Sequence, residues 1–354
     1  MSKIKLAVIF GGVSSEHEIS LISAASVIAN IPQDKYEIIC IGITKKGRWL
    51  FFPGDTSDLV SGSWEQHPDC ASAVLSPDRM HKGFIKILDD GQTSFQRVDC
   101  IFPVLHGKNG EDGTIQGLIA MSGIPYVGCD TLSSAICMDK TITHTVLEYN
   151  GIKTAPWEKV LRRDLCNLDE ECERIEASLS YPMFVKPANC GSSIGISKVC
   201  DRTELKDGVK LAFSHDSKVI VECEVKGHEI ECAVMGNDFP MASIAGEIKP
   251  ENEFYDYDAK YILSGTQLII PASISDDCQE KLRSIACDAY KALCCTGLAR
   301  VDFFVTENEE IVLNEVNTMP GFTSISMFPK LFEATNVPYA DLIDGLITLA
   351  LERN

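Results

Sequence analysis

Three oxygen-bearing side chains near the carboxyl terminus have the types and spacing of a metal site. Asp302 lies in the β-branched and aromatic segment 301–305, and Glu315 and Asn317 end a second such segment that begins at Ile311. A polar turn joins the two segments, which predicts a β-hairpin. Residues two apart on a strand share a face, and folding the hairpin about its turn places Asp302 roughly opposite Glu315. Opposed carboxylates repel each other on a sheet, so we expect a cation between them.

Mg²⁺ fits this oxygen-only set best, because its usual ligands are one or two carboxylates and the phosphates of a nucleotide. The alternative is that one carboxylate faces solvent while the other caps a turn. Two neighbouring features favour the metal: Arg300 precedes Asp302 by two residues, and the loop 317–321 follows the second strand.

The second chemical signal is a glycine- and serine-rich loop between two predicted strands. The first strand carries Lys186, and the second covers 196–199. The loop between them contains four small residues, Gly191, Ser192, Ser193 and Gly195. Small residues let backbone N–H groups approach an anion, so the pattern is typical of a phosphate-binding loop. It is not a Walker A loop, because Gly-Lys-Ser/Thr is absent. The alternative is an ordinary hairpin turn, which the length of the run and the flanking lysine disfavour.

The amino-terminal third has the strand–loop–helix order of a doubly wound α/β domain. A buried strand at 6–10 ends at two glycines and leads into a helix that reaches about Ala29. A second strand is expected at 36–43, and shorter strands and turns at 47–97. The dinucleotide fingerprint Gly-x-Gly-x-x-Gly is absent, which disfavours a nicotinamide-dependent oxidoreductase. The two glycines alone are equally consistent with a tight turn.

A loop with three glycines and two acidic residues, 106–114, follows a strand at 100–105 and precedes a helix at about 115–122. A helix N-terminus binds anions through its free backbone N–H groups. It also favours acidic caps, a role available to Glu111 and Asp112. Capping explains the acidic residues but not the three glycines.

The pattern changes after a further predicted strand at 124–127. A helix is expected to begin at a cap provided by Ser133 or Ser134 and to reach about Tyr149. We therefore place a domain boundary near Cys129.

Two strands, at 219–222 and 229–235, are joined by a short linker at 223–227. Such a hinge between two units is a common place for the flat base of a nucleotide to bind. The segment 254–261 has no clean period and is interpreted as a lid over the site, the alternative being an aromatic surface loop.

The last part of the chain contains two predicted helices. Ser275 is expected to cap a long amphipathic helix that reaches Cys295 and that Gly297 ends. A final helix is expected at 339–351. Three domains follow from these patterns: an α/β substrate-binding domain at 1–129, a central lobe at 130–226, and a catalytic and metal-binding lobe at 227–354.

Composition excludes several classes of function. The chain has 354 residues, 45% of them hydrophobic, and a formal net charge of −19 without a cluster of Lys or Arg. We therefore expect neither a nucleic-acid partner nor a membrane partner. The 15 cysteines show no Cys-x-x-Cys pair and sit in apolar surroundings, which indicates a reducing, cytoplasmic compartment. No segment is apolar enough to span a membrane.

Seven motifs in order resemble the D-alanine–D-alanine ligases of the ATP-grasp superfamily over nearly the whole chain. They are GGVSSEHEIS, HGKNGEDGT, SSAICMDK, FVKPANCGSSIGISKV, FYDYDAKY, ARVDFF and NEVNTMPGFTSISMFP. The resemblance implies an α/β fold: a Rossmann-like amino-terminal domain followed by a two-lobed ATP-grasp fold with an α+β carboxyl-terminal part. It also implies ATP-dependent joining of two D-alanines through a D-alanyl phosphate, for peptidoglycan precursor synthesis, in a homodimer.

The resemblance further implies roles for individual residues. The residues implied to act in catalysis are Glu16, Ser192, Tyr261, Arg300 and the backbone N–H of Gly321. Those implied to bind the amino acids are His106, Lys260, Ser326 and Met327. Those implied to contact ATP are Lys140, Lys186, Ser193, Glu222, Val225 and Glu229. Asp302, Glu315 and Asn317 are implied to hold two Mg²⁺ or Mn²⁺ ions, in agreement with the hairpin geometry.

Two positions depart from the family pattern. Cys223 stands where many relatives carry Lys beside the hinge, and His17 stands where Arg is frequent. Tyr261 and Met327 favour D-alanine at the second subsite, although an apolar pocket rejects an added hydroxyl only weakly. A D-serine or D-lactate ligase of the same fold, or a nucleotide-binding module without chemistry, are the alternatives. The retained metal ligands and Arg300 disfavour the last of these.

Overall fold

The computed structural model describes residues 3–249 and 267–353, and its amino-terminal part is built on a seven-stranded sheet. The strand order is β6-β5-β4-β3-β2-β1-β7, and only β1 with its neighbours β2 and β7 is parallel. The strands are β1 (Ile4–Gly11), β2 (Tyr36–Ile43), β3 (Trp49–Phe52), β4 (Ala71–Leu75), β5 (Gly83–Ile87), β6 (Thr93–Arg97) and β7 (Cys100–Val104). The Rossmann-like arrangement is therefore confined to one end of the sheet, where β2, β1 and β7 are parallel, and the antiparallel strands β3 to β6 extend it on the other side.

Two helices of this part, at 17–30 and 114–122, agree with the sequence, whereas a short helix and a 3₁₀ turn within 47–97 were not predicted and one predicted strand is wrong. The helices are α1 (His17–Asn30), α2 (Thr56–Ser61), the 3₁₀ turn η1 (Trp64–Gln66) and α3 (Thr114–Ser122). The segment 124–127 forms no strand and makes only an isolated parallel bridge from Tyr126 to Ile101. The chain needs to leave the sheet here, because α4 starts within a few residues.

The single helix predicted up to Tyr149 is two helices, α4 (Thr131–Met138) and α5 (Lys140–Tyr149). Aspartates cap them in place of the predicted serines: Asp130 accepts the Ser133 N–H, and Asp139 accepts the Thr141 N–H. A carboxylate at the cap satisfies free N–H groups and favours the positive end of the helix dipole. The break at Asp139 puts Lys140 at the start of α5, where its side chain reaches the glycine-serine loop at Cys190.

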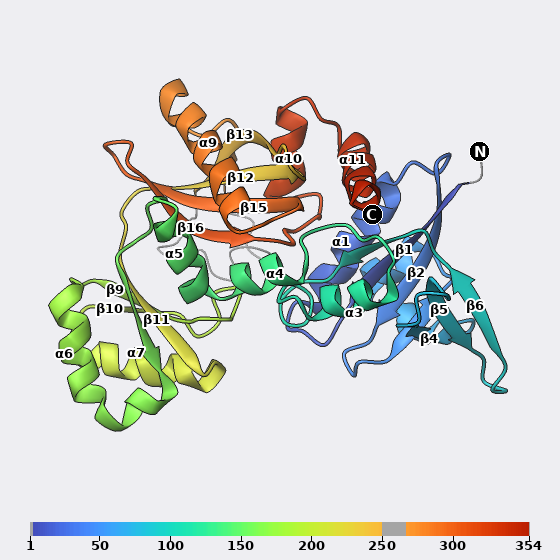
Figure 1. Cartoon of the computed structure of the whole chain (residues 1–354), viewed down its shortest axis with the longest axis horizontal. Helices are drawn as coiled ribbons and strands as arrows, with labels where there is room; N and C mark the ends of the chain where they lie inside the picture. Colours follow the sequence, from blue (N-terminus) through green and yellow to red (C-terminus); the bar gives the residue numbers. More distant parts are fainter. Residues whose placement is uncertain (1–2, 250–266, 354) are drawn as a thin grey trace.

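The central lobe consists of a four-stranded antiparallel sheet covered by helices on one side. The sheet has the order β10-β9-β11-β8. Its elements are β8 (Trp157–Leu161), η2 (Arg162–Asn167), α6 (Leu168–Ser178), β9 (Met183–Pro187), β10 (Ser197–Val199), α7 (Arg202–His215) and β11 (Lys218–Cys223). The helices α6 and α7 contribute Cys172, Ile175, Leu205 and Val209 to a core shared with this sheet. In Figure 1 this lobe lies apart from the amino-terminal domain, with α4 and α5 between them.

The third sheet contains the predicted hairpin. It has the order β14-β13-β12-β15-β16, all antiparallel. The strands are β12 (His228–Gly236), β13 (Met241–Lys249), β14 (Gln267–Ile269), β15 (Gly297–Val305) and β16 (Ile311–Asn317). The helix α9 (Asp276–Ala292) covers one face, where alternate residues such as Val301 and Phe303 are buried. The opposite face carries Arg300, Asp302 and Glu231, and residues 327–334 cover part of it.

The ends of α9 agree only in part with the sequence. The Ser275 hydroxyl accepts the Cys278 N–H, as predicted for the cap. The helix ends earlier than predicted, at Ala292, and Gly297 is the first residue of β15 with φ +72°. Gly297 does not cap the helix, because the C-cap is Leu293, four residues earlier. A Cβ at Gly297 would lie about 3 Å from the Gly128 backbone, so glycine allows a close approach there.

The last two helices connect the third sheet to the amino-terminal domain (Figure 1). α10 (Met327–Ala334) and α11 (Tyr339–Glu352) share one core with β1, α1 and β7. Asp344 on α11 accepts hydrogen bonds from Lys35 (2.7 Å) and Tyr36 (2.8 Å) at the start of β2. This shared core fixes the amino-terminal domain relative to the third sheet.

All 15 cysteines are free thiols. None of the helices within 3–249 and 267–353 has the length and apolar character needed to cross a membrane.

Candidate active site

The open face of the third sheet carries the charged residues in two adjacent rows. Directly paired residues on antiparallel strands point to the same face. Glu231 on β12 pairs with Asp302 on β15, which pairs with Glu315 on β16. In the next row, Arg300 pairs with Asn317. The predicted opposition of Asp302 and Glu315 is confirmed, and a bulge directly after Asp302 re-aims the hairpin at this point.

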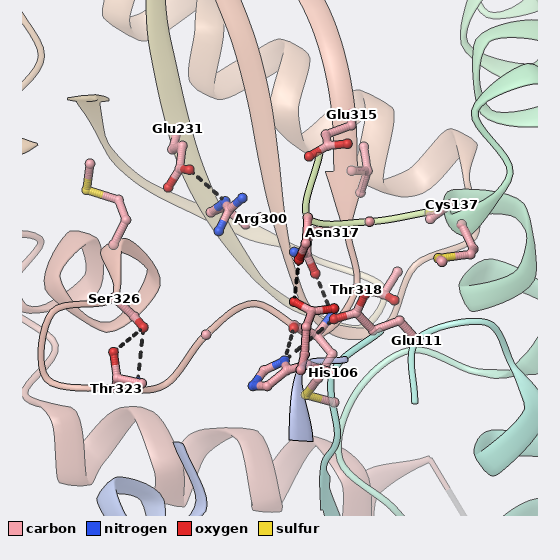
Figure 2. Close-up of a pocket in the computed structure, with 18 of the residues that line it drawn as sticks. His106, Glu111, Cys137, Glu231, Arg300, Glu315, Asn317, Thr318, Thr323 and Ser326 are labelled. Carbon is pink, nitrogen blue, oxygen red and sulfur yellow. Dashed lines mark hydrogen bonds and ion pairs between the residues drawn. The ribbon is translucent and has the colours of Figure 1, made fainter. Parts of the chain in front are cut away.

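Arg300 neutralises part of the charge in these rows. Its Nε and Nη2 donate to the two oxygens of Asp302 at 2.7 and 2.6 Å. Its Nε also lies 3.2 Å from Glu231 Oε1 (Figure 2). Burial alone lowers the pKa of Arg300, but the two carboxylates hold it well above the usual range. A fixed bidentate pair of this kind holds the guanidinium in one orientation.

Glu231 was missed by the sequence interpretation. Its side chain is only 7% exposed, and it faces the same cavity as Arg300. The available signal was the alternation on β12, in which Glu229 and Glu231 are two residues apart and therefore share a face. Polar residues that alternate on a strand usually face solvent, so that signal alone does not indicate a buried ion pair.

The side-chain oxygens of Asp302, Glu315 and Asn317 are of the type that Mg²⁺ prefers as ligands. Their side chains offer only carboxylate and amide oxygens, and Asn317 Oδ1 already accepts the Met319 N–H at 3.0 Å. Over the described parts of the chain, no cluster of three His, Cys, Asp or Glu side chains could hold a metal ion. A site with two protein carboxylates is nevertheless typical of Mg²⁺, which takes its remaining ligands from water and substrate phosphates.

The loop after β16 brings backbone groups next to these charges. A Cβ added to Gly321 would lie 2.6 Å from Ser326 Oγ, so the Ser326 hydroxyl touches the backbone there. Ser326 Oγ accepts the Thr323 N–H at 3.0 Å and lies 2.8 Å from Thr323 Oγ1 (Figure 2). Ser326 and Met327 begin α10 and line the same cavity as Arg300 and Gly321.

The amino-terminal domain contributes Glu16 to this cavity. Ser192 Oγ, in the glycine-serine loop of the central lobe, donates to Glu16 Oε1 at 2.6 Å. A Cβ on Gly107 would meet Glu16 Oε2 at 2.6 Å, and Gly107 has φ +70°, so the glycine allows the loop to approach the carboxylate. The predicted partnership of Glu16 and Ser192 therefore joins two distant parts of the fold.

His106 lies buried between the amino-terminal domain and the loop after β16. Its Nδ1 lies 3.1 Å from the Met319 carbonyl oxygen and 3.5 Å from Glu111 Oε1, and its Nε2 lies 3.1 Å from Ser23 Oγ. Burial lowers the pKa of His106, but Glu111, Glu16 and the Met319 carbonyl raise it more, so the net direction is upward. The N-cap residue of α3 is Gly113, and Asp112, one residue before it, accepts the Thr114 N–H. The prediction that Glu111 also caps this helix is wrong, because Glu111 faces His106.

The predicted ATP residues gather round a second cavity, of about 1040 Å³, between the central lobe and the third sheet. Lys186 on β9 lies 2.5 Å from Glu222 on β11, and His144 Nε2 lies 3.1 Å from the other Glu222 oxygen. Burial raises the pKa of Glu222, but Lys186 and His144 outweigh it and hold the pKa far below its usual range. Ser193, Val225 and Glu229 line the same cavity.

The two cavities share a wall. The shared residues include Lys140, Cys190, Ser192 and Glu315, and the Lys140 ammonium donates to the Cys190 carbonyl at 2.9 Å. Lys140 Nζ also lies 3.8 Å from Glu315 Oε2. Groups bound in the two cavities would therefore meet beside Lys140 and Glu315.

Two predicted residues and the predicted lid cannot be placed. Lys260, Tyr261 and the whole segment 254–261 lie outside the described residues.

The two positions that depart from the family pattern, Cys223 and His17, both lie within the described residues. Cys223 lines the second cavity, with its Sγ 3.7 Å from the Ser180 carbonyl oxygen, and His17 Nδ1 lies 2.8 Å from the Gly12 carbonyl oxygen.

Comparisons with known proteins agree over the whole chain. The family models described as D-ala D-ala ligase N-terminus and C-terminus match residues 5–129 and 146–348. The D-alanine--D-alanine ligase of Caldicellulosiruptor bescii is 50% identical over 100% of this chain and 97% of its own length. The solved structure of the VanG D-Ala:D-Ser ligase from Enterococcus faecalis has a TM-score of 0.91 at 42% identity, covering 99% of this chain and 100% of that one. The D-alanine-D-alanine ligase from Coxiella burnetii has a TM-score of 0.89 at 35% identity, covering 100% and 95%. With both family models matched and full-length relatives this similar, the chain belongs to the D-alanine–D-alanine ligase family and has the ATP-grasp fold.

Proposed function

We propose that this enzyme uses ATP to join two molecules of D-alanine into D-alanyl-D-alanine. The carboxylate of the first D-alanine attacks the γ-phosphorus, which forms an acyl phosphate and releases ADP. The neutral amine of the second D-alanine then attacks the acyl carbon, inorganic phosphate leaves, and the amine loses a proton as the amide forms. The observation that carries this proposal is the wall shared by the two cavities, which lets a carboxylate and a nucleotide phosphate meet beside Lys140.

The smaller cavity offers groups of the right charge for two amino acids. Glu16, held by Ser192, is placed to bind the ammonium of the first D-alanine. Arg300 and the Gly321 N–H are placed to stabilise the negative oxygen that develops on the acyl carbon; such preorganised donors often contribute most to catalysis. Ser326 would contact the carboxylate of the second D-alanine, with Lys260 completing that contact, and Tyr261 would join Glu16 and Ser192. His106 would border the first amino acid.

The larger cavity would bind ATP. Lys140 and Lys186 would contact the α- and β-phosphates, with Ser193 in the loop above them, and Glu222, Val225 and Glu229 would border the adenine and ribose. The family uses ATP together with a divalent metal, generally Mg²⁺. We propose that Asp302, Glu315 and Asn317 hold two such ions. When bound, they would neutralise charge on the transferred phosphoryl group.

D-Serine as the second amino acid is the other candidate. It is favoured by the high similarity of the whole fold to the VanG D-Ala:D-Ser ligase. Against it stands Met327, a buried apolar side chain where D-serine ligases are expected to carry a polar one. An apolar wall discriminates only about 10²-fold against an added hydroxyl, so D-alanine would be preferred without strict exclusion of D-serine.

The division of the chain into parts at 1–129, 130–226 and 227–354 belongs to the same proposal. It is supported by the separate core of the central lobe. A homodimer is proposed from the family resemblance alone, and light scattering after size-exclusion chromatography tests it.

ATP-dependent phosphate release with Mg²⁺ tests the proposed reaction. We expect turnover with D-alanine alone, formation of the dipeptide, and no response to L-alanine. Release only when D-serine or D-lactate is added to D-alanine would move the assignment to the corresponding mixed ligase. No release with any of these pairs would contradict a ligase function.

A further inference from the structure

We propose that Gly246 sets the size of the second amino-acid subsite, because the space beside it is filled by the Met327 thioether. This inference rests on the proposed function, in which Met327 borders the second amino acid. Gly246 lies on β13 and pairs directly with Glu231, so its Cα faces the same side of the sheet as the charged rows. It touches no substrate in this proposal and acts only by positioning Met327.

The requirement for glycine at this position is spatial. The backbone of Gly246 is not in the left-handed region, so any residue type could adopt it. An added Cβ, however, would lie 2.8 Å from Leu331 Cδ2, 3.0 Å from Met327 Sδ and 3.2 Å from Ile270 Cγ1. Any side chain at 246 must therefore shift the Leu331 methyl group, and Met327 and Ile270 must each give way by a few tenths of an ångström.

The packing decides which neighbour moves furthest. Leu331 is fully buried on α10 and belongs to the aromatic core with Phe328 and Phe332. A close-packed core resists such displacement. Met327 is 5% exposed and borders the cavity that contains Arg300 and Ser326, which leaves it open space on one side. An unbranched thioether also changes conformation easily. We therefore expect Met327 to move, and the open direction leads into the cavity.

Movement of Met327 toward the cavity would reduce the room for the side chain of the second amino acid. One methylene more or less in an apolar pocket changes specificity by about 10- to 200-fold. The effect should therefore fall on amino acids slightly larger than D-alanine, and it should leave the nucleotide cavity unchanged, because Met327 does not line that cavity.

The test is a competition between D-alanine and D-2-aminobutyrate, which has one methylene more, at equal concentrations with ATP and Mg²⁺. Fragmentation mass spectrometry gives the ratio of D-alanyl-D-2-aminobutyrate to D-alanyl-D-alanine and the order of residues in the mixed product. In Gly246→Ala we expect this ratio to fall about tenfold, with the KM for ATP unchanged. An unchanged ratio in an active variant would overturn the role of Gly246.

Two further variants isolate the contact with Met327. Met327→Ala should raise the ratio, and Gly246→Ala combined with Met327→Ala should show no loss relative to Met327→Ala alone, because no thioether remains to be displaced. An equal tenfold loss in that double variant would overturn the proposed route through Met327. Gly345→Ala is the matched control, since its added Cβ would meet another methionine, Met235 Cε at 3.2 Å, at a residue that lines neither cavity.

Solubility of the variants is informative too. If Gly246→Ala does not fold, the double variant with Met327→Ala should recover folding when Met327 is the obstacle. Failure of both to fold would identify Leu331 as the obstacle and overturn the inference. A wild type that makes no D-alanyl-D-alanine would contradict the proposed function and this inference together, whereas an active wild type with an unchanged ratio in Gly246→Ala contradicts this inference alone.

Discussion

Two buried ion networks flank the shared wall, and they differ in their ratio of carboxylates to cationic side chains. In the nucleotide cavity, one carboxylate, Glu222, lies between the nitrogen groups of Lys186 and His144. On the third sheet, one guanidinium, Arg300, lies between the carboxylates of Asp302 and Glu231. The first network thus pairs one carboxylate with the Lys186 ammonium at the edge of the cavity. The second has two carboxylates for one guanidinium, so it carries a net negative charge.

The difference explains how one site can hold both a polyanion and its cations. Phosphates would be drawn to Lys186 and Lys140, and metal ions to the row of Asp302 and Glu315. The networks also differ in construction. Arg300, Asp302 and Glu231 all belong to one sheet, which makes their geometry rigid. His144 is on a helix and reaches a different sheet, so its contact depends on how α5 packs against the central lobe.

The largest effect on activity is expected from a change at Arg300, in the network with Asp302 and Glu231. Arg300→Lys replaces a two-pronged donor by a point charge and loses the bidentate contact with Asp302. Loss of such a preorganised donor costs about 10²–10³-fold in kcat. Steady-state phosphate release measures it. Arg283→Lys, a partly buried arginine on α9 that bonds the Ala242 carbonyl, is the control, and a loss of less than about tenfold at Arg300 would contradict the oxyanion role.

The next largest effect tests the negative balance of the same network. Glu315→Gln removes one charge from the row, so we expect the Mg²⁺ concentration for half-maximal activity to rise about 100-fold. Titration of Mg²⁺–ATP binding by calorimetry gives an independent measure. Asp302→Asn should behave alike, whereas Glu310→Gln, an exposed acid in the turn of the hairpin, should not. Wild-type Mg²⁺ dependence in both site variants would remove these residues from the metal site.

A smaller effect, on the affinity for ATP, is expected from a change in the network of Glu222, Lys186 and His144. His144→Leu leaves one Glu222 oxygen buried without its imidazole neighbour, so Lys186 loses its fixed position. We expect the KM for ATP to rise about tenfold, equivalent to about 1.4 kcal/mol, with little change in kcat. His144→Gln keeps an N–H donor and should recover most of the affinity. An equal fall of kcat in both variants, with KM unchanged, would indicate a structural role only.

The smallest effect concerns His106, which lies outside both networks. Because its folded pKa is raised above its ordinary value of 6.5, its charged form stabilises the fold below that pH. This contribution is lost as the pH rises through the folded pKa. Glu111→Gln should therefore lower the pKa of His106, which NMR titration of the ring measures. It should also reduce the free energy of unfolding by about 1 kcal/mol near pH 6, and less near pH 9. A greater loss at pH 9 would contradict the assignment.

Local patterns predicted the elements well where one signal dominated. The hairpin of β15 and β16, the cap at Ser275 and the strand–loop–strand around Lys186 all follow from alternation and turn residues close together in the chain. The errors came from competing local signals. Both aspartates and serines cap helices, and at 130–139 the aspartates did so, which divided one predicted helix into α4 and α5. Glu111 was interpreted as a cap because its tertiary partner His106 was not visible to a local rule.

By itself, the sequence determined which chemical groups are present and on which face of each strand they lie. Periodicity is a property of neighbouring residues, so the opposition of Asp302 and Glu315 could be derived before any fold was known. Only the tertiary structure decided which charges are buried together and where space remains. Glu16 meets Ser192 across 176 positions of the chain, and the room beside Gly246 is defined by side chains on α10 more than 80 positions later. Such contacts depend on how separate sheets and helices pack, which no local pattern encodes.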